Sequence, residues 1–136
     1  MDGNLSSPRM KKLDITPISG DFSVCKIADL SGVPLCDEFV FLSKTDEEIS
    51  LVCLSSSVPE NIAEESCGWQ AFRVCGVLDF SLTGILADIS RVLADGCVGI
   101  FAVSTYNTDY VLTKSENFAR ALDVLSGAGY TVLQEV

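Results

Sequence analysis

Segment 77–86 carries residue types well suited to holding a small anionic group. Asp79 and Ser81 follow an apolar run, and Gly84 stands in the early turn of the helix expected after them. The start of a helix exposes unpaired N–H groups and a partial positive charge, so a ligand carboxylate would be stabilised there. Gly84 lacks a side chain and would let a ligand or a neighbouring backbone come close. The simpler interpretation is that Ser81 only caps the helix and Gly84 only packs it against a sheet.

A second polar group lies at residues 104–109, between two apolar segments. Its hydroxyl groups and carboxylate could bind a small polar molecule, with Thr105, Tyr106 and Asp109 as candidate contacts. The same residue types also form turns through side-chain to backbone hydrogen bonds. Asp109 is more informative, because a carboxylate at the start of a buried strand needs a partner. That partner could be a cationic group of a ligand, or else Lys114 or Arg73.

The composition excludes much catalytic chemistry. The 136 residues include no histidine, which removes the commonest general base and the commonest metal ligand. Nine Lys and Arg stand against nineteen Asp and Glu, a net charge of −10, whereas nucleic acids and anionic membranes bind basic surfaces. The acidic run 46–48 lacks the spacing of a calcium loop, and no Gly-rich phosphate loop occurs. We therefore expect no enzymatic activity, no cofactor, no metal, and neither nucleic acid nor membrane as a partner.

The six cysteines form no metal or redox motif. No Cys-x-x-Cys pair is present, and the N-terminal residues show no apolar secretion segment, so we expect a cytoplasmic protein. Cys36 and Cys67 have loop-like surroundings and are the expected reactive thiols, although a catalytic thiol would lack the histidine that normally activates it. The other four lie in or beside apolar runs and are expected in the core: Cys25, Cys53, Cys75 and Cys97.

Residues 69–133 show the clearest periodicity. Apolar alternation predicts strands at 69–78, 98–103, 109–113 and 130–133. A spacing of three and four residues predicts one helix over 82–94 and another that is capped by Ser115 and ends near Gly127. The order β-α-β-β-α-β is the ferredoxin-like plan of an α+β protein.

The first half repeats part of this pattern. Strands are predicted at 13–18, 22–28, 38–43 and 49–54, with a turn at 19–21 and a linker or short distorted helix at 55–67. Residues 40–52 align without gaps on 101–113, and 22–25 align on 72–75, but only ten residues at 29–38 replace the first helix. The sequence therefore predicts two copies of one fold. They follow a disordered tail at 1–10, and comprise a degenerate first domain at 11–64, with its first helix shortened, and a second domain at 65–136.

Segments 78–86 and 100–112 together resemble the small tandem ACT-domain proteins, relatives of the ACT modules of aspartate kinases and of the CASTOR-type arginine sensors. Segment 41–53 and the Gly68–Trp69 pair are also similar, so the resemblance covers residues 20–133. It implies tandem ferredoxin-like (βαββαβ) domains and a ligand beside the loop from first strand to first helix, at a domain interface. The usual Asp-x-Pro-Gly of that loop is replaced here by a longer segment without proline. The site residues that the resemblance implies are Asp79, Ser81, Gly84 and Ile85, with Thr105, Tyr106 and Asp109 from the second motif.

Two functions follow as alternatives. The first is a homodimeric regulatory module that binds an amino acid, with the ligand carboxylate at the helix start and its cationic end at Asp79 or Asp109. The acidic charge makes arginine and lysine the first candidates. The second is a dimerisation or protein-interaction partner without a small ligand, which predicts an exposed apolar sheet face at Trp69, Ala71 and Val77.

Overall fold

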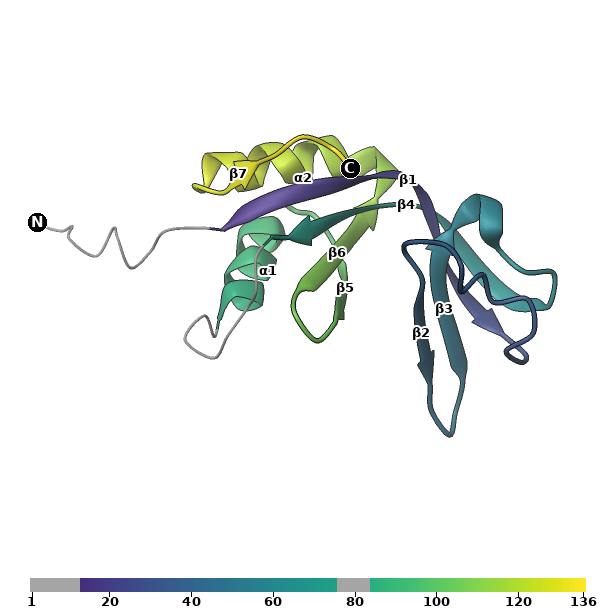
Figure 1. Ribbon diagram of the computed structural model, residues 1–136. Coiled ribbons are helices and arrows are strands. Elements are labelled where there is room, and N and C mark those ends of the chain that lie inside the picture. The colour runs from purple at the N-terminus through teal and green to yellow at the C-terminus, as the bar shows by residue number, and fades with distance from the viewer. Residues whose placement is uncertain (1–12, 76–83) are drawn as a thin grey trace, which may run out of the picture.

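The computed structural model describes residues 13–75 and 84–136, so the predicted tail at 1–10 and the segment 76–83 lie outside the described residues. The described chain forms one sheet of seven strands with two α-helices (Figure 1). No helix in these two stretches is long and apolar enough to cross a membrane. The elements are β1 (Asp14–Ile27), β2 (Phe41–Lys44), β3 (Ile49–Leu54), the 3-10 turn η2 (Ser55–Ser57), β4 (Ile62–Val74), α1 (Ile85–Asp95), β5 (Phe101–Ser104), β6 (Asp109–Lys114), α2 (Ser115–Gly127) and β7 (Thr131–Val132).

The second half has the predicted element order, β4-α1-β5-β6-α2-β7. The sheet order is β2-β3-β1-β4-β6-β5, so β6 lies between the two strands that α1 connects, as in a split βαβ unit. The last strand, β7, pairs in parallel with the start of β1, at Asp14 and Ile15. The N-terminal end of β1 is therefore inserted between β7 and β4.

The predicted turn at 19–21 is wrong, because β1 continues through it as one strand of 14 residues. Gly20 has a φ of 106°, and the register between β1 and β4 shifts between Ile18 and Phe22. A glycine at positive φ inside a strand produces a bulge and a bend instead of a hairpin. In the same way β4 begins at Ile62 and crosses the predicted domain boundary at 64/65. Both long strands pass from one half of the molecule to the other (Figure 1).

The first half departs from prediction in its connections. We expected a shortened first helix, but residues 28–40 form a loop without a helix. The linker or short distorted helix expected at 55–67 is a loop with one 3-10 turn over 55–61, whereas 62–67 belong to β4. The two loops hold each other: Asn61 Nδ2 donates to Asp29 Oδ1 at 2.8 Å, and Ser57 Oγ donates to Asp37 Oδ2 at 2.6 Å. Pro34 and Pro59 lie inside these two connections, and a proline interrupts the hydrogen bonding of a helix.

Three groups of buried side chains stabilise the sheet. A helix-side core lies under α1 and α2, and a loop-side core lies under the two loops of the first half. Between the two halves is a central core, where the rings of Phe41 and Tyr110 are 5.0 Å apart. Because β2 and β6 are not neighbours in the sheet, this contact requires the sheet to fold over on itself. The central core is formed by Ile18, Phe22, Val52, Ala71 and Leu112, with Trp69, Phe101, Val103 and Tyr110 partly buried beside it.

The cysteines are partly as predicted. Cys25 and Cys53 are buried, Cys36 and Cys67 are exposed, and all six are free thiols. The prediction for Cys97 is wrong: this residue is exposed, because it stands in the turn after α1 with a φ of 62° and not in the strand that begins four residues later. Cys75 is only half-buried.

Burial raises the pKa of the Cys53 thiol from about 9.0 to about 11, and the nearby Cys25, Asp37 and Glu65 add to the shift. The unfolded chain therefore loses this proton at lower pH than the native protein does. The stabilisation is complete below pH 9 and is lost as the pH rises through 11. We expect the free energy of unfolding in urea to fall by about 2 kcal/mol across this range because of Cys53 alone. The fall should persist in Cys36→Ser and shrink in Cys53→Val; an equal fall in both variants would contradict the assignment.

Candidate functional site

Asp109 begins β6 and is the only carboxylate of the described chain that is buried, with 8% of its surface exposed. The register pairs Phe72 of β4 with Val111 of β6, and side chains alternate between faces along a strand. Asp109 therefore shares a face with Val111 and Val74, both in the helix-side core. The carboxylate lies beside the end of β4, from which the chain continues towards α1.

The hairpin between β5 and β6 fixes the position of Asp109. The backbone N–H of Thr105 donates to the carbonyl of Thr108 at 2.8 Å, and the Thr105 hydroxyl donates to the same oxygen at 3.0 Å. The Thr108 hydroxyl in turn donates to the carbonyl of Val74, the last residue of β4. These bonds tie the hairpin tip to the end of β4. Because Ser104 pairs with Asp109 across the hairpin, a hydroxyl and a carboxylate stand side by side.

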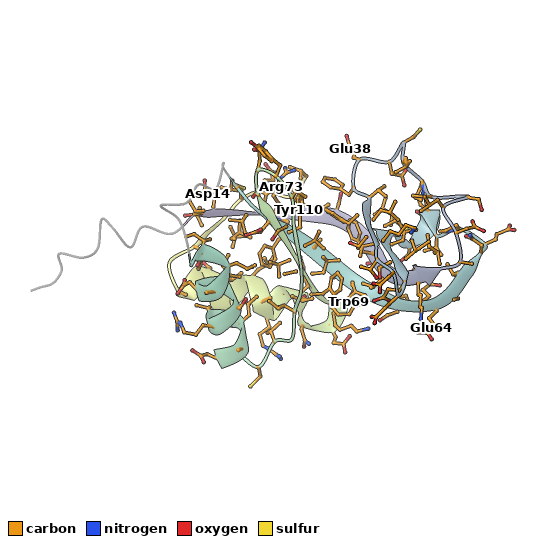
Figure 2. All side chains as sticks on the ribbon, turned by 90° about the horizontal axis from the view of Figure 1, so that it is seen from below. Asp14, Glu38, Glu64, Trp69, Arg73 and Tyr110 are labelled. Carbon is orange, nitrogen blue, oxygen red and sulfur yellow. The ribbon has the colours of Figure 1, made fainter. Side chains whose placement is uncertain are left out.

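The Asp109 side chain has no hydrogen-bond or ion-pair partner within residues 13–75 and 84–136. Neither of the two internal cations proposed for it bonds to it; Arg73 lies beside Tyr110 instead (Figure 2). Lys114 Nζ lies 4.7 Å from the centre of the Trp69 ring and 3.2 Å from the carbonyl of Cys67. Arg73 Nη1 is 3.4 Å from the hydroxyl of Tyr110. A carboxylate on a residue with little exposed surface and no counter-charge among the described residues is a candidate to contact a cationic group from outside.

The start of α1 differs from its prediction. The helix begins at Ile85 and not at residue 82, with Gly84 as N-cap residue at a φ of 99°. Ile85 packs partly buried against the helix-side core. No side-chain hydrogen bond caps α1 within the described residues. The first N–H groups of a helix have no partner inside the helix itself. Ser81, the predicted cap, lies outside the described residues.

Replacement of Gly84 by alanine should destabilise the protein although it creates no clash. A Cβ at this position would meet no atom within 4 Å, but the φ of 99° is one that L-residues rarely adopt. We expect a loss of about 1–2 kcal/mol in urea unfolding, entirely from backbone strain. Gly127→Ala is the matched control: a Cβ there also meets nothing within 4 Å, and the backbone is helical. If the two variants lose equal stability, the strain at Gly84 is not the cause.

The seven predicted site residues are only partly brought together. Asp109 and Ile85 both lie at the helix-side core, and Gly84 precedes Ile85 at the helix start. The polar groups of Thr105 are used in the turn, and Tyr106 at the hairpin tip is fully exposed. Asp79 and Ser81 lie outside the described residues. Ser104 and Thr108 belong to the polar segment 104–109 but were not among the named site residues, although the symmetry of the hairpin about residues 106 and 107 places them beside Asp109 and Thr105.

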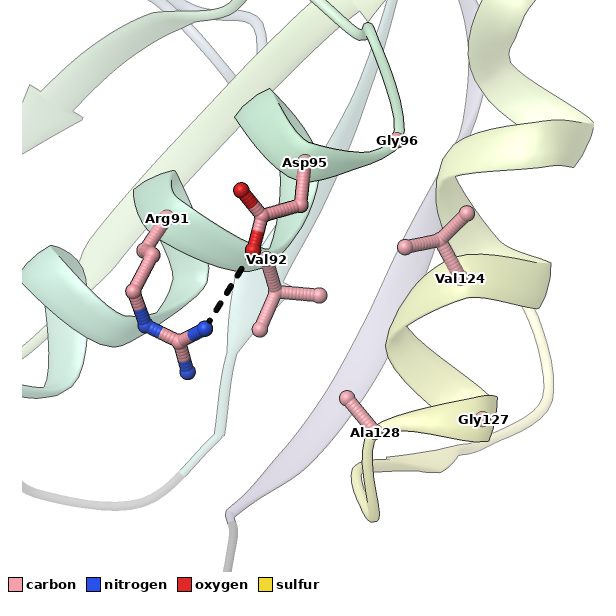
Figure 3. A pocket seen from close by; sticks show the side chains of 7 residues that line it. All are labelled: Arg91, Val92, Asp95, Gly96, Val124, Gly127 and Ala128. Carbon is pink, nitrogen blue, oxygen red and sulfur yellow. Dashed lines mark hydrogen bonds and ion pairs between the residues drawn. The ribbon is translucent and has the colours of Figure 1, made fainter.

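A separate groove of about 390 Å³ lies between the C-terminal halves of the two helices (Figure 3). Arg91 stands at its edge and pairs with Asp88 at 2.7 Å and Asp95 at 3.4 Å. The Tyr130 hydroxyl donates to the other oxygen of Asp88 at 2.5 Å, and burial together with this bond raises the pKa of Tyr130. These polar groups are satisfied by one another. In the described ranges no three His, Cys, Asp or Glu side chains come together as a metal site.

A family model for the ACT domain matches residues 64–127, which run from β4 to the end of α2 and include Asp109, Gly84 and Ile85. The second half of the chain thus has the β-α-β-β-α order within a segment that matches this family.

Solved structures extend the likeness to most of the chain. Protein Atu0741 of Agobacterium tumefaciens is 28% identical, with a TM-score of 0.82 over 92% of this chain and 95% of that one. A Vibrio cholerae protein of unknown function is 17% identical, with a TM-score of 0.72 over 88% and 92% of the two chains. The regulatory subunit of aspartate kinase from Thermus thermophilus is 12% identical, with a TM-score of 0.54 over 87% and 95%. The last two likenesses concern the fold alone.

Proposed function

We propose that this protein is a non-catalytic regulatory module that binds an amino acid at an interface between ACT-type units. The observation that carries the proposal is the buried, unpartnered carboxylate of Asp109 at the end of β4, within the segment that matches the ACT family. The resemblance of the fold to a regulatory subunit of aspartate kinase supports a regulatory role.

In this mechanism the two ends of the ligand meet groups of opposite charge. The ligand's cationic group binds Asp109, and its carboxylate binds N–H groups at the start of α1, near Gly84. Asp79 and Ser81 are expected to complete the site. A cationic ligand relieves the cost of the buried charge, so we favour lysine or arginine, in keeping with the predicted kinship to arginine sensors.

We further propose that the first half, residues 11–64, is a second ACT-type copy that has lost both helices. The other copy then comprises residues 65–136. In its support, β3 lies between β1 and β2 in the same split order in which β6 lies between β4 and β5. A ligand held between two such units would favour one of their arrangements, and in a homodimer this change could reach a second subunit.

Calorimetric titration of the full chain with each of the twenty amino acids tests the proposal. We expect one or a few basic amino acids to bind at physiological salt, with a Kd below about 1 mM, equivalent to about 4 kcal/mol. If none binds below this limit, the proposal fails.

The alternative function, an interaction partner without a ligand, predicted an exposed apolar sheet face, and the described part of that face is not exposed. Ala71 is fully buried and Trp69 is half-buried, because the first half of the chain covers this face of the sheet. Val77 lies outside the described residues.

A further inference from the structure

One face of the first half is covered by loops, whereas the second half has helices in the corresponding position. In the second half, α1 and α2 pack on the helix-side core. In the first half, the loops 28–40 and 55–61 stand in the corresponding position, and Val33, Val40 and Val58 pack only partly buried against the loop-side core. We call the surface formed by these two loops and the outer side of β2 the loop face.

The loop face leaves large apolar side chains in water. Leu35 is 72% exposed and Leu30 is 51% exposed, both on the loop that replaces the first helix. Leu42 of β2, 39% exposed, pairs with Leu51 and so lies on the same side of the sheet as the loop-side core. Half of the six exposed large apolar residues of the described chain therefore belong to this face. Large exposed apolar side chains on one face of a protein are typical of an interaction surface.

The first half of the chain, which carries the loop face, is strongly negative. Residues 21–67 contain two cationic side chains against ten carboxylates, a net charge of −8 out of −10 for the whole chain. The ion pairs formed within the described residues, those of Arg91, all lie in the second half. The carboxylates Asp29 and Asp37 are held between the two loops by hydrogen bonds, whereas Glu38 and Glu60 are exposed. Two copies of this face would repel each other, and so would an anionic membrane.

We propose that the loop face docks a basic amphipathic helix of a partner protein, which takes the position that α1 and α2 have in the second half. Its apolar side would cover Leu30, Leu35 and Leu42, and its Lys and Arg residues would face the surrounding carboxylates. Such a contact would pass the state of the regulatory module to the protein that it controls. The inference does not depend on the presence of an amino-acid ligand.

A synthetic probe tests this surface on the full-length protein. The probe is a fluorescent helix of about 18 Leu and Lys residues, roughly five turns, with all leucines on one side. A second peptide of equal length carries Glu in place of Lys. Binding is measured by fluorescence anisotropy. The variants are Leu30→Ser with Leu35→Ser, and, as a control outside the loop face, Leu133→Ser, whose side chain is 41% exposed.

We expect the basic probe to bind, the acidic peptide not to bind, and the Leu30 and Leu35 replacements to weaken binding about tenfold or more, since each removes buried apolar area. The control should change affinity less than about twofold, as surface substitutions outside a contact do. If the basic probe binds wild type and the Leu30/Leu35 variant equally well, the proposal is overturned, because charge alone would then explain the binding of the probe. Sedimentation velocity is a second test of the proposal. If the wild-type protein is a dimer and the Leu30/Leu35 variant is a monomer, a second copy of the chain occupies the loop face, and the proposal is overturned.

Discussion

Replacement of Asp109 by asparagine is expected to stabilise the protein and to abolish its ligand binding. Asp109 is only 8% exposed and its carboxylate has no counter-charge within the described residues, so its negative charge is unpaired there. Asparagine has nearly the same shape without the charge, and we expect the free energy of unfolding to rise by about 1 kcal/mol. The same change removes the counter-charge for the ligand's cation and should weaken amino-acid binding about 100-fold. Urea unfolding and calorimetry measure the two effects.

The opposite signs of these effects make the test specific. Asp123→Asn on α2 removes the same charge from an exposed position, so it controls for the overall charge of the protein. We expect this control to change neither quantity by a measurable amount. If Asp109→Asn instead lowers stability, the carboxylate has a structural role in the native protein. If affinity is unchanged, the cationic end of the ligand binds elsewhere.

The position of Asp109 could be predicted from the sequence, but its lack of a partner could not. A carboxylate at the start of an apolar, alternating segment indicates a buried strand end. Whether Arg73 or Lys114 reaches it depends on side-chain directions set by the register of β4 and β6. Arg73 instead lies 5.9 Å from the centre of the Tyr110 ring, and Lys114 lies over Trp69. These contacts are made across strands and leave no pattern along the chain.

The elements themselves were predictable where one face of each was apolar. The strand at 49–54 has its predicted bounds, and the helix predicted after Lys114 is α2. The segment around Gly20 was misread because a Ser-Gly-Asp sequence fits a turn as well as a bulge, and only pairing with Ala71 and Trp69 on β4 distinguishes them. Ser115 was expected to cap α2, yet it is the first helical residue and its buried hydroxyl has no partner in the described parts of the chain.

Replacement of Phe22 by alanine should destabilise both halves of the molecule together. Phe22 is fully buried in the central core, and on β1 it pairs with Leu54 of β3 on one side and Trp69 of β4 on the other. The loss of a large buried ring costs about 3–5 kcal/mol. Because β1 and β4 run through both halves, neither half can release its share of the core without disrupting the other. In native-state hydrogen exchange, the amides of β3 and of α2 should lose protection by the same amount.

A comparison with Leu42→Ala separates this joint effect from a local one. Leu42 lies on β2, well exposed, so its truncation should cost less than about 1 kcal/mol. If Phe22→Ala lowered protection in β3 while α2 kept its wild-type value, the halves would be independent domains with a boundary near residue 64. Equal losses would instead mean that the two long strands couple them into one cooperative unit. A ligand bound beside Asp109 would then stabilise the distant loop face as well, since any ligand that binds only the native state stabilises the whole cooperative unit.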